Sequence, residues 1–262
     1  MQHFRLSKRE KFLIVTFVLT GGVLATQLVS LDNRVETVIG LFLGAYLLSA
    51  WALREDLNGI EWVTLLLLPA LYTASISLFY FLLPVRWLTR LPTIVFFAIG
   101  MYALLLTENI YNVAAERSIQ LVRAAHSVGL LLTLVTNFFF FNTLLALHLP
   151  SWQNAIGACI ISMPLSLQAL WSVTISEKTI SSRIWLYTLT IAIVISQMTF
   201  FLSFWPVKGI VAALFLTSVL YVLLGFGQQR LLDRLFTTVI RELILVGCLV
   251  FVLMLFATRW GA

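Results

Sequence analysis

Nine long runs of apolar residues follow one another along the 262-residue chain, and they constrain its fold more than any other feature. A helix needs about 20 mainly apolar residues to cross the hydrocarbon core of a bilayer. The runs are residues 12–30, 36–53, 60–83, 93–112, 126–147, 154–175, 184–204, 207–227 and 242–258. They lack the alternation that marks the strands of an outer-membrane barrel. The sequence therefore predicts an all-α, polytopic transmembrane helical bundle with nine spans, or with eight as the alternative.

Few residues are available to cover a surface that faces water. Only 11% of the residues are charged and 61% are hydrophobic, whereas about 25% are charged in an ordinary soluble domain. The surface must therefore face lipid, and the short loops leave no room for a soluble domain. We expect residues 1–262 to form a single integral membrane domain that crosses the cell (inner or plasma) membrane several times, with the lipid bilayer around it.

The basic residues predict which loops face the cytoplasm. If the N-terminus is cytoplasmic, twelve of the 17 Lys and Arg residues lie on the inner side, as expected from the excess of basic residues in cytoplasmic loops. Topology and contacts with anionic lipid headgroups at the inner leaflet then account for the net charge of +6. No nucleic acid partner is expected, and the sequence does not identify a protein partner.

Two segments have the pattern of amphipathic helices on the inner membrane surface. On a helical wheel, the polar side chains of residues 107–129 gather on one third of the circumference. The flanking spans need most of this length, so the surface linker is expected near residues 112–124. The second linker, near residues 228–241, is basic on one face and apolar on the other, which is typical of helices that lie in the interface.

Polar groups at the ends of the first linker form a candidate inner-face site. One interpretation is a surface helix with internal Glu–Arg pairing, and the other is a vestibule in which the polar groups converge on a ligand. Glu108 and His126 are the candidate catalytic residues, because either one could move a proton beside a phosphate held by arginines. The inner-face polar cluster around them comprises Asn112, Glu116, Arg117 and Arg123.

Three uncharged amides lie inside the apolar runs, namely Asn137, Gln168 and Gln197. An amide in hydrocarbon costs several kcal/mol unless it is hydrogen-bonded. We therefore expect these side chains to turn inward, either as bonds between helices or as a binding site for a small polar ligand. No run has a charged residue near its centre, which argues against a proton-coupled carrier.

The usual catalytic and metal-binding motifs are missing from the sequence. It contains no HExxH and no GxSxG, and its three histidines are too scattered for a usual zinc site. Cys159 and Cys248 sit in apolar runs, away from any thiolate metal pattern. We expect no metal and no cofactor, and the sequence favours a protein that is not an enzyme without excluding catalysis.

Glycine and proline patterns carry further expectations about packing. Gly40 and Gly44 form a GxxxG motif, which suits close helix packing and is expected to pack inside the bundle. The predicted outer loops "HLPSWQ" and "FWPVKG" combine tryptophan with proline. This combination is typical of interface anchors and tight turns, with a platform for lipid or glycan as the alternative.

The stretch "LLTENIYNVAAERSIQLVRAAHSVGLLLTLVTNFFFFNTLLALHLP", residues 105–150, resembles uncharacterised bacterial multi-spanning membrane proteins of unknown function, as does the overall layout. The resemblance covers most of the chain. It implies a helical membrane fold and supplies no site residues.

The first functional hypothesis is a non-enzymatic bundle, permease-like or lipid-binding, which takes an uncharged or lipidic substrate through the three amides. One alternative is a membrane-embedded enzyme that acts on a lipid-linked substrate at the inner face. The other is a scaffold or assembly subunit of a membrane complex.

Overall fold

The computed structural model describes residues 7–26, 29, 33–55, 57, 59–84, 86–113, 119–174, 180–233 and 236–258. These residues form nine α-helices and no strand, so the predicted all-α fold is confirmed. The helices are α1 (Lys8–Ala25), α2 (Arg34–Leu53), α3 (Glu61–Leu82), α4 (Trp87–Asn112), α5 (Ile119–Ala146), α6 (Ser151–Trp171), α7 (Ser182–Leu202), α8 (Gly209–Leu231) and α9 (Thr237–Ala257).

Eight of the nine described helices, α2 to α9, are long and apolar enough to cross a membrane. A helix of 20 residues spans about 30 Å at its rise of about 1.5 Å per residue, which matches the hydrocarbon core. α1 is the exception because it begins with the charged residues Lys8, Arg9, Glu10 and Lys11. The chain is thus a multi-pass membrane protein. The count of nine spans, the cytoplasmic N-terminus and the identity of the membrane stay predictions.

The chain divides into two compact units, residues 1–132 and residues 133–262, which we call unit 1 and unit 2. The division falls within α5, so each unit contains four complete helices and part of α5. Each unit is described by itself below. The single membrane domain expected from the sequence stays a prediction.

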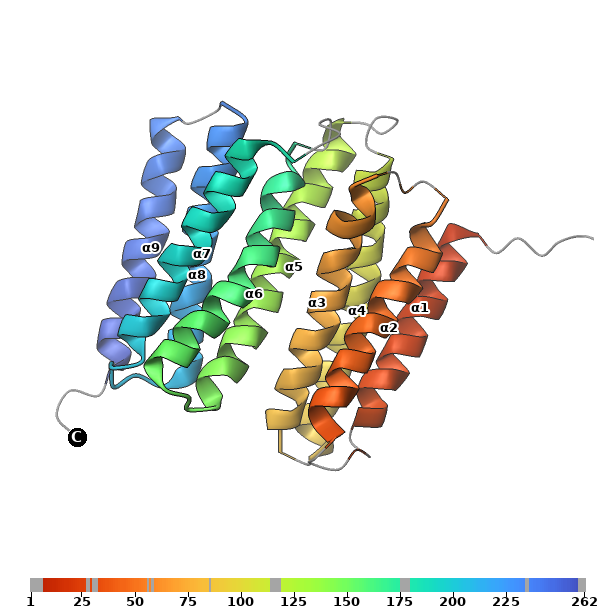
Figure 1. Ribbon diagram of the computed structural model, residues 1–262, viewed down its shortest axis with the longest axis horizontal. Coiled ribbons are helices and arrows are strands. Elements are labelled where there is room, and N and C mark those ends of the chain that lie inside the picture. Colours follow the sequence, from red (N-terminus) through yellow and green to blue (C-terminus); the bar gives the residue numbers. More distant parts are fainter. Residues whose placement is uncertain are drawn as a thin grey trace, which may run out of the picture. The chain divides into compact units, whose positions relative to one another are not determined.

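In unit 1, α1 to α4 close on one another (Figure 1), since α1 packs on α2 and α4, and α3 packs on the same two helices. Tyr72 of α3 stacks on Phe97 of α4 with 5.6 Å between ring centroids, and its hydroxyl donates to the Phe96 carbonyl at 3.2 Å. Gly100 makes this approach possible, because a Cβ at that position would collide with the Tyr72 hydroxyl.

Among the described helices of unit 1, α3 has the largest number of buried hydroxyl residues. The hydroxyls of Thr73, Ser75 and Ser77 donate to carbonyls of their own helix at 2.9, 2.9 and 2.7 Å. A hydroxyl that is satisfied in this way can be buried without a partner on another helix. The small side chains also let neighbouring helices approach, so α3 occupies the interior of unit 1.

In unit 2, α6 packs on α7, α8 packs on both of them, and α9 packs on α8 (Figure 1). Leu243 and Met254 are the buried residues of α9. Leu243 lies where Gly225 of α8 leaves room, because a Cβ at Gly225 would come within 2.7 Å of the Leu243 Cδ2. At the far end of α9, the Trp205 Nε1 donates to the Thr258 Oγ1 at 2.9 Å.

The two predicted surface linkers coincide largely with helix ends. α4 continues to Asn112 and α5 begins at Ile119, so the first linker shares residues with both, while residues 114–118 lie outside the described part of the chain. The second linker is divided between the end of α8 at Leu231 and the start of α9 at Thr237, with residues 234 and 235 outside the described part.

The glycine motif of α2 does not pack as expected from the sequence. A Cβ built on Gly40 or Gly44 meets nothing within 4 Å, and Gly40 is exposed. The prediction that this motif packs inside the bundle is therefore wrong for the described residues. The close glycine contact of α2 instead comes from its neighbour, since a Cβ on Gly22 of α1 would approach the Leu41 Cδ2 to 2.7 Å.

Candidate functional site

The three amides that the sequence nominated as a ligand site all fall in unit 2, at different depths. Asn137 lies nine residues before the end of α5, Gln197 five residues before the end of α7, and Gln168 seventeen residues after the start of α6. These three helix ends lie at the same end of the unit, so the rise of a helix puts the amides about 14, 8 and 26 Å from it. The geometry does not bring them together.

The environments of these amides differ as well. Asn137 is fully buried, and its Nδ2 donates to the Thr217 Oγ1 of α8 at 3.1 Å. Gln168 is buried near the end of α6, whereas Gln197 is exposed on α7. Asn137 thus forms a hydrogen bond between two helices, which is one of the two interpretations offered by the sequence. The inward orientation expected for Gln197 is not found.

The inner-face candidates lie in unit 1, where α4 meets the start of α5. Glu108 is fully buried. One turn later, Tyr111 packs against His126 with 5.3 Å between ring centroids, and its hydroxyl donates to the Ala125 carbonyl at 3.0 Å. Gly129 makes room for this hydroxyl, since a Cβ there would approach it to 2.6 Å. The structure therefore brings α4 and α5 together near both candidate catalytic residues.

The polar cluster predicted around these two residues is only partly assembled. The Asn112 Nδ2 donates to the Leu53 carbonyl at 3.5 Å, at the end of α2. Arg123 is exposed on α5. Glu116 and Arg117 lie outside the described residues. Of the arginines expected to hold a phosphate, Arg123 is thus the one among the described residues.

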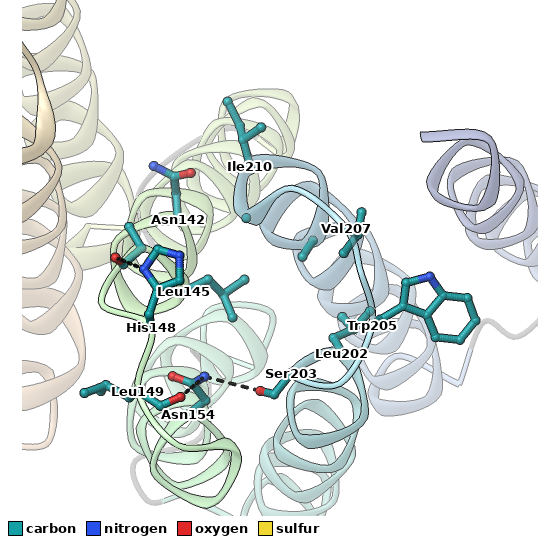
Figure 2. A pocket seen from close by; sticks show the side chains of 13 residues that line it. Asn142, Leu145, His148, Leu149, Asn154, Leu202, Ser203, Trp205, Val207 and Ile210 are labelled. Carbon is teal, nitrogen blue, oxygen red and sulfur yellow. Dashed lines mark hydrogen bonds between the residues drawn. The ribbon is translucent and has the colours of Figure 1, made fainter. Parts of the chain in front are cut away.

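A cavity of about 510 Å³ lies in unit 2 at the end where α5 is joined to α6 and α7 to α8. We call it the amide cavity, after Asn142 and Asn154 in its wall. Figure 2 shows these two residues and His148 on the α5–α6 side, with Ser203 and Trp205 on the α7–α8 side. Its volume falls within the range of about 300–1,000 Å³ that is usual for small-molecule sites.

Two short connections shape the amide cavity. His148 adopts a left-handed backbone with a φ of 49°, which ends α5, and Pro150 follows as the N-cap of α6. On the other side, the α7–α8 connection turns at Trp205 and Lys208 is the N-cap of α8. Both of these loops combine tryptophan with proline in the sequence. The Trp205 indole extends toward α9 (Figure 2), where its Nε1 donates to the Thr258 Oγ1, so it anchors the loop, and a platform for lipid or glycan stays a prediction.

The Asn154 amide joins the two sides of the cavity. Its Nδ2 donates to the Leu149 carbonyl at 3.1 Å and to the Ser203 Oγ at 3.2 Å, and Asn154 is only 4% exposed. Its Oδ1 has no hydrogen-bond partner among the described residues. A buried acceptor without a partner costs about 1–3 kcal/mol, so a donor that reaches Asn154 would be favoured.

His148 adds another acceptor to the same wall. Its Nδ1 lies 2.9 Å from the Ala146 carbonyl. A carbonyl only accepts, so Nδ1 must donate, and in the neutral imidazole Nε2 is then the acceptor. The polar wall therefore offers hydrogen-bond acceptors to a bound molecule.

The remaining wall of the amide cavity is apolar, and none of the residues described as lining it carries a fixed charge. The apolar residues are Leu145, Ala146, Leu149, Leu202, Val207, Ile210 and Ala212. Ser203 donates its hydroxyl proton to the Thr199 carbonyl at 2.9 Å, so it is not aligned with His148 as a nucleophile would be with its base. The wall of the cavity thus combines uncharged polar groups with apolar side chains.

Sequence reasoning described these loops as anchors and passed over their polar side chains. The available signal was the placement of Asn142, His148, Asn154 and Ser203 at the ends of successive apolar runs, which antiparallel neighbours bring to one end of a bundle. In the described residues, no three His, Cys, Asp or Glu side chains gather as metal ligands would.

The described residues thus form a helical, multi-pass membrane protein with a cavity at one end of unit 2. The chain belongs to a family described as protein of unknown function (DUF5656), which it matches over residues 44–257. This match confirms the resemblance to a family without an assigned activity, while a bacterial source stays a prediction. No curated protein and no solved structure matches the chain.

Proposed function

We propose that the protein is a membrane-embedded binding protein for a neutral amphiphile, a molecule with an uncharged headgroup rich in hydrogen-bond donors and an apolar tail. The amide cavity carries this proposal, because its wall combines the uncharged polar side chains of Asn142, Asn154 and His148 with aliphatic residues and contains no fixed charge. A sugar or polyol headgroup on a lipid has the matching chemistry, since its hydroxyls donate and its carbon skeleton is apolar.

The same observations favour binding over catalysis. A charged headgroup would leave its charge without a counter-charge in a half-enclosed site, which is costly. A hydrolytic reaction would need a nucleophile aligned with a base, and the Ser203 proton is donated to a backbone carbonyl instead. The enzyme and scaffold hypotheses drawn from the sequence stay predictions, with no observation at this cavity in their favour.

A pair of blocking variants tests the proposal. Ala146 lines the cavity and is exposed, so Ala146→Trp fills the cavity without disturbing a packed core. Leu147→Trp is the matched control, because Leu147 is its exposed neighbour and does not line the cavity. The full chain would be purified in detergent with a monoglucosyl diacylglycerol as the probe, and the retained lipid would be counted by native mass spectrometry.

Retention of the glycolipid should fall about tenfold or more in Ala146→Trp and stay unchanged in Leu147→Trp. Asn142→Ala removes one neutral polar group of the wall and should lower retention about two- to tenfold, which corresponds to a bond of about 0.5–1.5 kcal/mol. Gln197→Ala, an exposed amide outside the cavity, serves as its control. Equal retention in both tryptophan variants would refute the proposal.

A further inference from the structure

Another hollow lies between α7 and α8, at the opposite end of unit 2 from the amide cavity. It consists of two adjacent parts, both of which are lined by Tyr187 and Arg230. The first part, of about 500 Å³, also contains Arg183 and Asp233, and we call it the arginine cavity. The second part, of about 350 Å³, is lined chiefly by apolar residues and we call it the apolar groove.

The arginine cavity has the chemistry of an anion site. Arg183 and Arg230 are both exposed, and in the part of the chain that the structure describes neither guanidinium makes an ion pair or a side-chain hydrogen bond. Guanidinium groups match phosphate oxygens in geometry and charge. Arg183 is also the second residue of α7, whose first-turn N–H groups favour an anion at the same place.

Asp233 limits the charge of the anion that fits. It lines the same cavity just beyond the end of α8. With two guanidinium groups and one carboxylate, the wall carries one net positive charge. This balance matches a phosphodiester, which carries one negative charge, better than a phosphate monoester, which carries up to two.

The apolar groove indicates that the anion is part of a lipid. Ile191, Leu223 and Phe226 line it, and Gly227 lets α8 approach α6, since a Cβ there would come within 2.8 Å of the Leu170 Cδ2. A free phosphate would occupy the arginine cavity and leave the groove unused. A phospholipid fills both, with its acyl chain in a groove that runs between two membrane-crossing helices.

We propose that unit 2 binds a phospholipid between α7 and α8, with its phosphodiester headgroup on Arg183 and Arg230 and an acyl chain along Ile191, Leu223 and Phe226. This site is distinct from the amide cavity and takes the opposite kind of headgroup. It is specific, in contrast to the general attraction of anionic lipids to basic loops.

Native mass spectrometry of the full chain, exchanged into phosphatidylglycerol, phosphatidylcholine or soluble glycerol phosphate, tests the proposal. The wild-type protein should retain phosphatidylglycerol over the other two probes. The double variant R183Q/R230Q should retain about tenfold less of it, since a charge-assisted hydrogen bond is worth about tenfold or more in affinity. Both arginines are exposed, so the variant should keep its melting temperature.

Arg241→Gln is the matched charge control, because Arg241 is exposed on α9 and does not line either hollow. Asp233→Asn should raise retention, because it removes the one carboxylate of the wall. If R183Q/R230Q and R241Q lose phosphatidylglycerol equally, the lipid is held by general basic charge and the proposal is wrong.

The groove has its own test. Thr190→Trp places a large ring in the apolar groove, whereas Leu189→Trp places the same ring on a neighbouring exposed position outside it. Only Thr190→Trp should lower retention of phosphatidylglycerol. Retention of glycerol phosphate equal to that of phosphatidylglycerol, or no difference between the two tryptophan variants, would show an anion site without a lipid and overturn the proposal. Ala146→Trp should leave phosphatidylglycerol retention unchanged, which separates this site from the amide cavity.

Discussion

α3 and α9 are both long enough to cross a membrane, yet their surroundings are opposite. In the apolar window of α3, 67% of the residues are buried within the protein, whereas in that of α9 only 11% are. α9 is nevertheless the most apolar of the eight helices by hydropathy. The buried faces of α3 carry residues such as Thr73, Ser75 and Ser77, while α9 exposes Leu245, Leu253 and Phe256.

This contrast shows that the hydropathy of a helix does not indicate how much of it is buried within the protein. Lipid tails are as apolar as leucine, so apolar area does not drive one helix onto another within the bilayer. Close approach of small residues and satisfied hydroxyls do so instead. Of these two helices, α9 is the more apolar and the more exposed, whereas α3, with its small and hydroxyl-bearing side chains, is the more buried.

The largest difference in stability between the interior of unit 1 and α9 is expected when a lysine replaces a glutamate in each. Glu108 is fully buried and Glu242 is exposed at the start of α9. Glu108→Lys should lower the free energy of unfolding by about 3–5 kcal/mol, because it leaves a buried charge without compensation. Glu242→Lys should change it by less than about 0.5 kcal/mol. Thermal unfolding in one detergent measures both changes. Glu108→Gln is the control, because it keeps the size of the side chain. Similar melting temperatures for the two lysine variants would contradict the difference between the two regions.

Replacing one glycine in each region by alanine adds a single methyl group and tests how tightly that region is packed. Gly100→Ala should destabilise unit 1 by about 1–3 kcal/mol, because the new Cβ collides with the buried Tyr72. Gly247→Ala on α9 should be neutral or stabilising by up to about 1 kcal/mol, because its Cβ would lie 3.5 Å from the Val222 Cγ2 and glycine weakens a helix. Urea or thermal unfolding gives the sign of each change, and a stable Gly100→Ala variant would contradict the packing described for Tyr72.

The attachment of α9 can be weakened without touching its lipid-facing side. Thr258→Val removes the acceptor of the Trp205 Nε1 and should cost about 1 kcal/mol. The loss should appear as faster amide hydrogen exchange in α9 with α3 unchanged. Ser218→Ala, which removes a hydroxyl bonded only to the Leu214 carbonyl of its own helix, is the control. Equal acceleration in both helices would mean that α9 is not an independently held element.

The smallest effect concerns the start of α1. The Ser7 backbone N–H and hydroxyl bond the Glu10 side chain and lower the pKa of that carboxyl below its ordinary value of 4.5. A lowered pKa in the folded state stabilises the helix start above pH 4.5, and this contribution is lost as the pH falls through the folded pKa. Amide exchange in the first turn of α1 should therefore accelerate below pH 4.5 after correction for intrinsic rates. Glu10→Gln should abolish that pH dependence, and an unchanged profile would exclude the capping box as its source.

The helices could be predicted because their boundaries depend on apolar length alone. The run predicted at residues 184–204 is α7 at Ser182–Leu202, and the run at 242–258 lies within α9 apart from its last residue. α5 departs from its prediction because it begins at Ile119 rather than near residue 126. The amphipathic segment there continues into the spanning helix, and composition alone cannot place that junction.

The cavities could not be predicted because they depend on which face of each helix packs. In lipid both faces of a helix are apolar, so periodicity does not reveal the packed one. Gln197 and Gly40 show the consequence, since each was expected to face the interior and each is exposed. The polar residues of the amide cavity sit at helix ends, where a polar side chain is ordinary and gives no signal of its own.

One turn in the wall of the amide cavity has a consequence of its own. His148 holds a left-handed backbone, where glycine fits freely and any L side chain costs roughly 1–2 kcal/mol. A chain selected for an easy reversal between α5 and α6 would place glycine at this corner. The imidazole stands there against the preference of the main chain, so under the proposed function this corner would trade conformational ease for a group that contacts the bound molecule.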